Sequence, residues 1–167
     1  MRNISEIILA NFIEFPDREF LTLLDKNGSS QTFNYGDLIK RSFRWLRLFN
    51  DRGLRPGDKI VIILQHGIDL YASFIGALIG GMVPAQFAFP SAKFSDEEYF
   101  KTIDKLLENA NGKLIVLYPE LRQKLEDRAL TNSLPGGFCS TFELPEQKES
   151  SFEEFDVNSE DIAFLQY

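Results

Sequence analysis

The sequence has one cysteine, one histidine and no run of basic residues. The single cysteine, Cys139, excludes an internal disulfide framework. No cleavable signal with a basic start and a long apolar centre is recognisable, so we expect a reducing, cytoplasmic compartment. The formal net charge is −7 and the pI is near 4.8. Because phosphate contacts need clustered Lys and Arg, this balance argues against a nucleic-acid partner.

Charged residues are also missing between Asp69 and Lys93, a stretch long enough to span a membrane. Within it, Gly76 and Gly80 have the spacing at which transmembrane helices pack. Two prolines and a Gly-Gly pair interrupt the stretch, however. A crossover helix buried against a sheet uses small residues for the same close approach. We therefore expect no membrane span.

The apolar content of the chain is high, with 44% hydrophobic residues and 16 phenylalanines among 167 residues, enough for one globular core. The run from Lys59 to Leu64 is short, rich in β-branched residues and bounded by turn residues, which predicts a buried strand. From Ile68 apolar residues recur at spacings of three and four, as on a helix face. Met82 to Ala85 is extended again. This order predicts a βαβ unit in a parallel sheet that is covered on both faces.

The same alternation of apolar runs and helical periods continues around this unit. Asn27-Gly28 between two β-rich runs predicts a small hairpin, and Ser95 to Glu98 has the pattern of a capping box. The other expected elements are a helix from Ile4 to Phe15 with Asn3 and Ser5 as candidate caps, a helix from Tyr35 capped by Asn34, a strand from Lys113 to Tyr118 and a helix from Pro119 to about Ala129. We expect an α/β fold of three layers, with a largely parallel sheet and the hairpin at its margin.

The segment 131–159 differs in composition from the rest of the chain. It starts with Asn, Ser, Pro and Gly and continues with acidic residues and few aliphatic ones. Such composition is typical of a surface linker. After it, Ile162 to Tyr167 is apolar and predicts a last strand. A strand with no following turn or helix is an unusual end for a domain, and we expect residues 1–167 to be part of a larger domain.

Two single residues are candidates for chemistry. Cys139 lies in an apolar context with no histidine beside it in the sequence, which favours a buried structural thiol over a nucleophile. His66 follows the end of an expected parallel strand, at the edge where open α/β sheets bind ligands. A functional imidazole and a turn imidazole bonded to backbone both fit this position, and the structural role is favoured.

Charged residues gather at two expected helices. The helix that begins at Tyr35 carries four arginines, distributed over its polar side and its C-terminal end: Arg41, Arg44, Arg47 and Arg52. We interpret them as a solvated face rather than an anion site. Acidic residues start the second helix, where capping explains them better than a metal site: Asp96, Glu97 and Glu98.

Four stretches of the sequence carry a family resemblance. They are, in order, Thr32-Phe33-Asn34-Tyr35-Gly36-Asp37-Leu38, then Gly53-Leu54-Arg55-Pro56-Gly57-Asp58-Lys59-Ile60, then the helix and strand from Phe74 to Pro84, and finally Asp161-Ile162-Ala163-Phe164-Leu165-Gln166-Tyr167. Each stretch is short, but the ordered set extends over nearly the whole chain. It resembles the N-terminal part of the adenylate-forming synthetases, which include acyl-CoA synthetases and fatty-acyl-AMP ligases.

The resemblance implies a two-step reaction. A carboxylate attacks the α-phosphate of ATP, with Mg²⁺, to give an acyl-adenylate and pyrophosphate, and a thiol of CoA or phosphopantetheine then takes the acyl group. In such enzymes a Ser/Thr/Gly-rich phosphate loop follows the strand that resembles Asp161 to Tyr167. That loop, the adenine-contacting and metal-binding motifs and the C-terminal domain would lie beyond Tyr167. No catalytic, cofactor-binding or metal-binding residue is therefore assigned within 1–167, and we expect this chain alone to be inactive and to self-associate.

The passage from Ala85 to Tyr99 and the ending Leu165-Gln166-Tyr167 are closer to fatty-acyl-AMP ligases. This likeness implies a fatty-acid substrate, a place in fatty acid metabolism and an acyl carrier protein as partner. Phe87 and Phe89 could line a pocket in this passage, but ordinary core positions are favoured. The alternative function is a self-contained, non-catalytic α/β binding or interaction module. Against a nucleotide-binding module, no Gly-rich phosphate loop with an accompanying Lys follows any expected strand.

Overall fold

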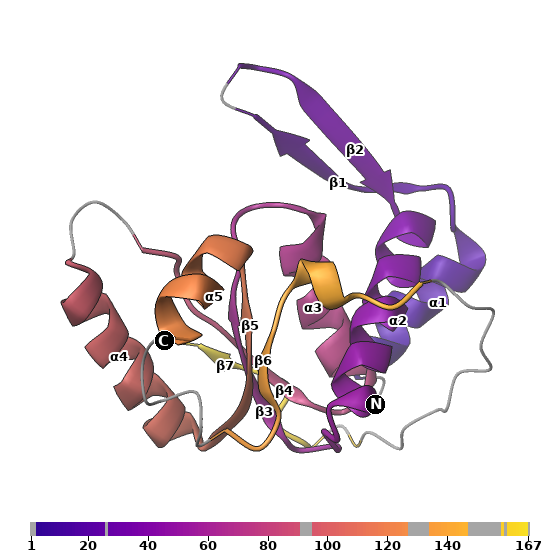
Figure 1. Ribbon diagram of the computed structural model, residues 1–167. Helices are drawn as coiled ribbons and strands as arrows, with labels where there is room; N and C mark the ends of the chain where they lie inside the picture. Colours follow the sequence, from indigo (N-terminus) through magenta and orange to yellow (C-terminus); the bar gives the residue numbers. More distant parts are fainter. Residues whose placement is uncertain are drawn as a thin grey trace.

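The computed structural model describes residues 3–25, 27–90, 95–126, 134–146, 158 and 160–166. Figure 1 shows a central sheet with helices on both of its faces and a hairpin that stands apart from them. The helices are α1 (Ile4–Glu14), α2 (Tyr35–Asp51), α3 (Ile68–Ile79), α4 (Asp96–Ala110) and α5 (Pro119–Glu126). The expected α/β fold with three layers is confirmed.

The central sheet is parallel throughout its described strands. These are β3 (Lys59–Ile63), β4 (Val83–Gln86), β5 (Gly112–Leu117), β6 (Gly137–Cys139) and β7 (Leu165–Gln166). Their order across the sheet is β6-β5-β3-β4-β7. The apolar run from Ile60 to Ile63 in the central strand is fully buried, because helices cover both faces of a parallel sheet. The strands expected at 59–64, 82–85 and 113–118 are confirmed.

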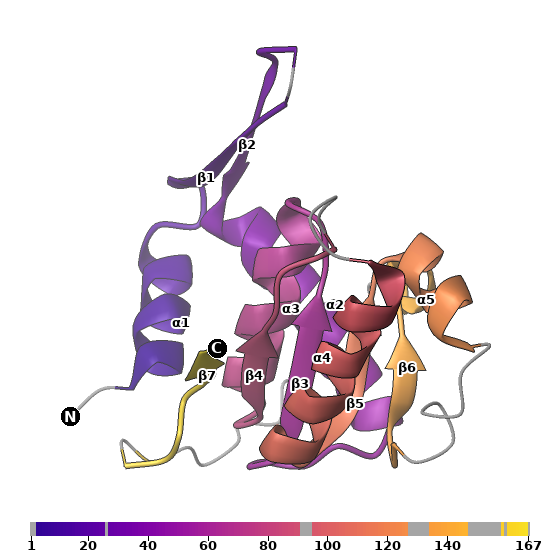
Figure 2. The ribbon, with the colours of Figure 1, turned by 90° about the vertical axis from the view of Figure 1, so that its left-hand side faces the viewer.

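The two faces of the sheet carry different helices. Helices α2 and α3 cover one face, whereas α4 and α5 cover the other (Figure 2). Because side chains alternate along a strand, Ile60 and Ile62 of β3 join the core under α2 and α3, while Val61 and Ile63 join the core under α4. Helix α1 packs outside the first layer, against α2 and α3.

Close packing of α2 on α3 depends on a glycine. A Cβ added at Gly76 would lie 2.5 Å from the Ser42 carbonyl oxygen and 3.2 Å from the Trp45 Cβ. The spacing of Gly76 and Gly80 is therefore explained by helix packing in the core, as expected from the sequence. Within the described residues no helix combines the length and the apolar character that crossing a bilayer requires.

Helices α1, α2 and α4 begin with capping boxes on Asn3, Asn34 and Ser95. In each box the side chain of the cap accepts the third backbone N–H of the helix, and an acidic side chain accepts the N–H of the cap in return. Ser5, the other candidate cap of α1, has a different role. It is buried inside α1, and its hydroxyl donates to the Leu78 carbonyl at 2.9 Å.

The hairpin consists of β1 (Glu19–Leu24) and β2 (Ser30–Asn34), paired antiparallel. Its loop is longer than a two-residue turn, because the last register pair joins Leu24 to Ser30. The Asp25 carboxylate accepts the backbone N–H groups of Asn27 and Ser29, each at 2.8 Å. Gly28 takes the positive φ, 82°. Figure 2 shows the hairpin projecting away from the sheet and its helices.

Strand β6 lies inside the segment 131–159, whose composition indicated a surface linker. It pairs with β5, and its residues Phe138 and Cys139 are buried. A strand of three residues is too short to produce a periodic pattern, so composition alone could not show it. Residues 131–133, 147–157 and 159 of this segment lie outside the described residues, as does the expected end of α5 at Ala129.

Candidate functional site at the carboxyl edge of the sheet

The connections that leave β3 and β4 cross to opposite faces of the sheet. Strand β3 leads to α3 on one face, and β4 leads to α4 on the other. Where neighbouring parallel strands diverge in this way, a crevice forms outside their carboxyl ends, and ligands bind there in open α/β sheets. A pocket of about 490 Å³ lies at this position. It is the sheet edge to which the sequence assigned His66.

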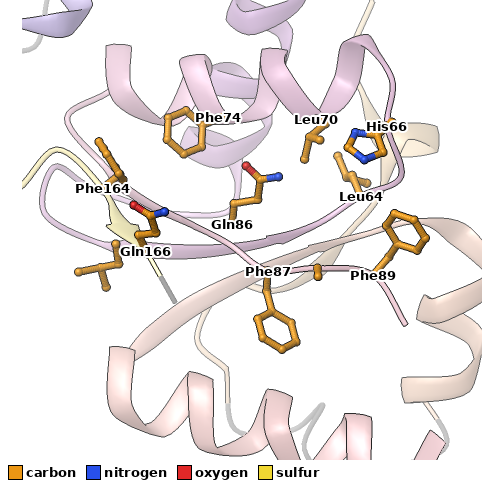
Figure 3. A pocket seen from close by; sticks show the side chains of 11 residues that line it. Leu64, His66, Leu70, Phe74, Gln86, Phe87, Phe89, Phe164 and Gln166 are labelled. Atoms are coloured by element: carbon orange, nitrogen blue, oxygen red, sulfur yellow. The ribbon is translucent and has the colours of Figure 1, made fainter. Parts of the chain in front are cut away.

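Residues from three strand ends, from α3 and from the loop after β4 line this pocket (Figure 3). They are Leu64, His66, Leu70, Phe74, Gln86, Phe87, Ala88, Phe89, Phe164, Leu165 and Gln166. The ring centroids of Phe74 and Phe164 are 5.8 Å apart. None of these described lining residues is Asp, Glu, Lys or Arg. The pocket is therefore an aromatic and aliphatic hollow with a few neutral polar groups.

His66 lies at one end of the pocket, with Phe89 (Figure 3). The two rings meet edge to face, with centroids 6.1 Å apart and an interplanar angle of 88°. His66 is exposed, and its imidazole makes no hydrogen bond to the described residues. The expected turn imidazole bonded to backbone is therefore not observed, and the ring borders the pocket instead.

Phe87 and Phe89 differ in their surroundings. Phe87 points to the opposite side of the sheet edge, toward α4 (Figure 3), where its ring centroid is 5.8 Å from that of Tyr99. The Tyr99 hydroxyl donates to the Ala88 carbonyl at 2.6 Å, and burial raises its pKa above the ordinary tyrosine range. Phe87 thus packs against the core, as expected, whereas Phe89 is 40% exposed at the rim.

Gln86 and Gln166 provide amide groups on the floor of the pocket. They are register partners on the adjacent strands β4 and β7, so their side chains leave the sheet on the same face. Both are exposed to solvent within the pocket. The sequence analysis did not single out this pair. A polar residue at the end of each apolar strand is the signal that was present, but the pairing of β4 with β7 was needed to bring the two together.

Asp69 fixes the start of α3, which forms one wall of the pocket. The Arg41 guanidinium donates to both carboxylate oxygens, from Nε at 2.6 Å and from Nη2 at 2.7 Å. The buried Trp45 indole donates to the same carboxylate at 3.0 Å. These bonds hold α3 on α2, and Asp69 raises the pKa of Arg41 mainly through the side-chain hydrogen bond. The positions of Leu70 and Phe74 depend on this attachment.

The interpretation of the α2 arginines as a solvated face holds for Arg47 and needs correction for the others. Arg47 forms only a long contact with Asp51, at 3.9 Å, near the surface. Arg41 binds Asp69, the Arg44 Nε donates to the Pro145 carbonyl at 2.8 Å, and Arg52 binds Glu143. Helical periodicity places these residues on the polar side of α2, but it cannot show that other elements cover part of that side.

Another hollow, of about 310 Å³, lies beside the carboxyl ends of β5 and β6. Its carboxylate, Glu143, binds both Arg52 and Arg122 and accepts the Ser140 backbone N–H at 3.0 Å. Cys139 is fully buried next to this cluster, and burial, with a contribution from Glu143, raises the pKa of its thiol to about 12. Because the thiolate is the nucleophilic form, this cysteine has the structural character expected from the sequence.

The acidic residues at the start of α4 are engaged in capping and ion pairs. Hydrogen bonds from Ser95 lower the pKa of Glu98, and Asp96 and Glu97 each contact a lysine at 2.8 Å. Across the described ranges, no group of three or more His, Cys, Asp or Glu side chains is placed to hold a metal ion. Glu98 thus has the expected capping role, while Asp96 and Glu97 pair with lysines.

Curated proteins resemble the chain over parts of its length. No protein-family model matches the chain. A stretch of 71 residues, 41% of the chain, is 35% identical to Disco-interacting protein 2 of Drosophila melanogaster and corresponds to 4% of that protein. Over 151 residues, 86% of the chain, it is 22% identical to an uncharacterized acyl-CoA ligase, YtcI, of Bacillus subtilis, of which the match covers 27%. The chain thus spans between 4% and 27% of the length of these curated relatives.

Solved structures agree with the chain over almost its whole length. The fatty acyl-adenylate ligase from L. pneumophila, in complex with acyl adenylate and pyrophosphate, matches 98% of the chain with a TM-score of 0.82 and 19% identity, and the match covers 27% of that protein. The McyG A-PCP protein, complexed with phenylalanyl-adenylate, matches 99% with a TM-score of 0.81 and 19% identity, covering 26% of it. At this identity the likeness shows the fold. The chain therefore has the fold of the N-terminal part of the adenylate-forming enzymes, and its resemblance to the acyl-CoA synthetase and fatty-acyl-AMP ligase family is confirmed.

Proposed function

We propose that the protein to which this chain belongs is an ATP-dependent ligase that activates a fatty acid. In the first step a carboxylate oxygen bonds to the α-phosphorus of ATP, the bond from that phosphorus to the bridging oxygen breaks, and pyrophosphate leaves. In the second step a thiol attacks the acyl carbonyl, AMP leaves, and the thiol proton passes to solvent. The fold match to two enzymes described with adenylates supports this chemistry.

The observation that carries the proposal is the position of β7. This strand lies parallel beside β4, so its carboxyl end is at the sheet edge that holds the pocket. Backbone N–H groups of a loop at such an edge can cradle phosphate oxygens and stabilise the charge that develops on them. We propose that the Ser/Thr/Gly-rich loop follows Tyr167 and approaches this pocket.

The described residues that line this pocket offer no charged partner to ATP or Mg²⁺. The pocket has no Lys or Arg among its described lining residues, and those residues also lack Asp and Glu. A triphosphate would therefore find neither cationic partners nor carboxylates for its metal ion here. We propose that the groups holding ATP and Mg²⁺ lie outside this chain, and that the chain alone forms no acyl-adenylate.

The choice of a fatty acid as substrate rests on the likeness of the passage 85–99 and of the ending 165–167 to fatty-acyl-AMP ligases. The fold alone does not select it, because TM-scores of 0.82 and 0.81 connect the chain equally to a fatty acyl-adenylate ligase and to a protein complexed with phenylalanyl-adenylate. The same sequence likeness supports the phosphopantetheine of an acyl carrier protein, rather than free CoA, as acceptor, and a place in fatty acid metabolism. The single cysteine and the lack of a recognisable cleavable signal support a cytoplasmic location.

Pyrophosphate exchange by the full-length protein tests this proposal. The protein is incubated with ATP, Mg²⁺, labelled pyrophosphate and carboxylic acids of graded length, with the 167-residue chain as the matched control. Label should enter ATP fastest with medium or long fatty acids and not at all with the 167-residue chain. Preference for acetate or an amino acid would reject the fatty-acid substrate. Absence of exchange with every acid would favour the alternative, a non-catalytic binding or interaction module.

A further inference from the structure

The pocket at the carboxyl edge contains hydrogen-bonding groups to which the described residues offer no partner. The side chains of Gln86 and Gln166 stand on the same face of the sheet, on the side of Phe74 and Phe164 (Figure 3). Within the described parts of the chain, neither amide has a hydrogen-bond partner. Each amide offers two N–H donors and one carbonyl acceptor. The floor of the pocket can therefore both donate to a ligand and accept from it.

The walls around these amides are apolar. Phe74 and Phe164 pack together at one end, with His66 and Phe89 at the other (Figure 3). Leu70 of α3 lies on the wall between them. A volume of about 490 Å³ is within the range of small-molecule sites, which are usually lined by apolar and aromatic groups with a few placed polar ones.

The lack of charged side chains among the described lining residues limits which ligands fit the pocket. Its described lining residues include no Asp, Glu, Lys or Arg, and Asp69 in the first turn of α3 is already bound by Arg41 and Trp45. An ionised head group would lose its hydration here without a counter-charge. A purely apolar ligand would remove water from the glutamine amides without replacing their hydrogen bonds. A neutral head with a donor and an acceptor avoids both costs.

We propose that this pocket is a binding site for an uncharged amphiphile, with a hydrocarbon body against Phe74 and Phe164 and a neutral carboxamide-like head on the Gln86–Gln166 pair. The proposed function places the phosphate loop at the same edge of the sheet, but this proposal rests only on the residues that line the pocket. The titration below follows the signals of Gln86 and Gln166 directly, so its failure is distinguishable from a failure of pyrophosphate exchange by the full-length protein.

Three probes of six carbons each test this preference: hexanamide, hexanoate and hexylammonium. Each is titrated into the ¹⁵N-labelled 167-residue chain, and the side-chain NH₂ signals of Gln86 and Gln166 are followed. Hexanamide should shift both signals saturably and bind at least about tenfold more tightly than either ion, a difference of the size expected for one hydrogen bond gained or lost. Binding of hexanoate or hexylammonium as tight as that of hexanamide would overturn the proposal.

Variants of the amide pair separate this site from adventitious binding. Gln86→Met keeps the length of the side chain and removes its hydrogen-bonding groups, and it should weaken hexanamide binding about tenfold. The control is Gln65→Met, an exposed glutamine outside the pocket, which should leave the affinity unchanged. Should Gln86→Met lower the melting temperature by more than a few degrees, Gln166→Met on the edge strand β7 tests the same pair. The proposed site would be contradicted if a folded Gln86→Met or Gln166→Met variant bound hexanamide with unchanged affinity. An equal loss of affinity in Gln65→Met would contradict it as well.

Discussion

Arg41 of α2 and Asp69 of α3 are joined by two parallel hydrogen bonds, with Nε–Oδ1 at 2.6 Å and Nη2–Oδ2 at 2.7 Å. Their side chains are 32% and 19% exposed, so water only partly screens the pair. The same carboxylate accepts the indole N–H of Trp45, a fully buried side chain. Asp69 thus links the main core of the chain to the helix that forms a wall of the pocket.

Asp69→Asn should destabilise the chain by about 1–3 kcal/mol, because the amide keeps an acceptor for Trp45 but leaves Arg41 without a counter-charge. The matched control is Asp51→Asn, which removes the exposed contact with Arg47 and should cost less than about 0.5 kcal/mol. Urea unfolding at neutral pH measures both changes. Equal effects of the two substitutions would show that the buried attachment of α3 contributes nothing.

Gly76→Ala should be strongly destabilising although alanine favours helices. Its Cβ would meet the Ser42 carbonyl oxygen at 2.5 Å, a backbone atom that cannot move aside without shifting α2. We expect a net loss of about 2–4 kcal/mol after the gain in helix propensity of about 1 kcal/mol. Gly80→Ala is the informative comparison, because its added Cβ would meet the flexible end of Leu46 at 2.4 Å. Thermal unfolding should rank Gly76→Ala as clearly the worse of the two.

The buried thiol of Cys139 should make the folded chain less stable at alkaline pH. Its pKa is raised to about 12 in the folded chain, whereas an unfolded cysteine titrates near pH 8.5, to within about a unit. Between these values the unfolded chain loses a proton that the folded chain keeps. The contribution of the Cys139 thiol to the free energy of unfolding is therefore complete below about pH 8.5. It declines as pH rises toward 12, by up to about 1.4 kcal/mol per pH unit.

Cys139→Ala removes this titration, while other alkaline titrations are common to both proteins. The variant should be less stable at pH 7.5, by about 1 kcal/mol for the lost packing, and its stability should fall less steeply between pH 8.5 and 10.5. Urea unfolding at several pH values measures the two slopes. Parallel profiles would mean that the thiol ionises in the folded chain as readily as in the unfolded one.

The 167-residue chain should self-associate through apolar surface. Several large apolar side chains on α1, the hairpin and the connections are exposed, among them Ile13, Leu24, Phe142 and Ile162 at 78%, 77%, 83% and 62%. Such groups, together with the short edge strand β7, favour contacts between copies. Sedimentation velocity over a range of concentrations should show species larger than a monomer. A monomer at every concentration would count against this expectation, and Ile13→Glu should reduce association if α1 contributes to it.

Much of the fold follows from local patterns in the sequence. The runs 60–64 and 114–117 are apolar without interruption because both faces of those strands are buried. Asn34 and Ser95 are recognisable as caps because capping depends on neighbours three residues apart. Strand β6 escaped prediction since it has three residues and derives its burial from β5. Short strands at a sheet edge are defined by their partners more than by their own composition.

The site was predictable only in its location. The expected strand at 59–64 placed His66 at the edge where parallel sheets bind ligands, and the pocket is there. Its walls were not predictable, because Phe164 and Gln166 reach it through the pairing of β7 with β4, a contact across 80 residues of sequence. The partners of Arg44 and Arg52, Pro145 and Glu143, are still more distant in the sequence, at separations of 101 and 91 residues. Such contacts follow from the topology as a whole.

The most direct test of the central claim is to identify what the full-length protein makes from ATP and a fatty acid. Full-length protein, dodecanoate, ATP and Mg²⁺ are incubated without a thiol acceptor, and the nucleotide products are resolved by mass spectrometry, with the 167-residue chain as control. We predict dodecanoyl-AMP and pyrophosphate from the full-length protein and neither product from the control. Formation of ADP, or the absence of any adenylate with all carboxylic acids tried, would contradict the assignment of an adenylate-forming ligase.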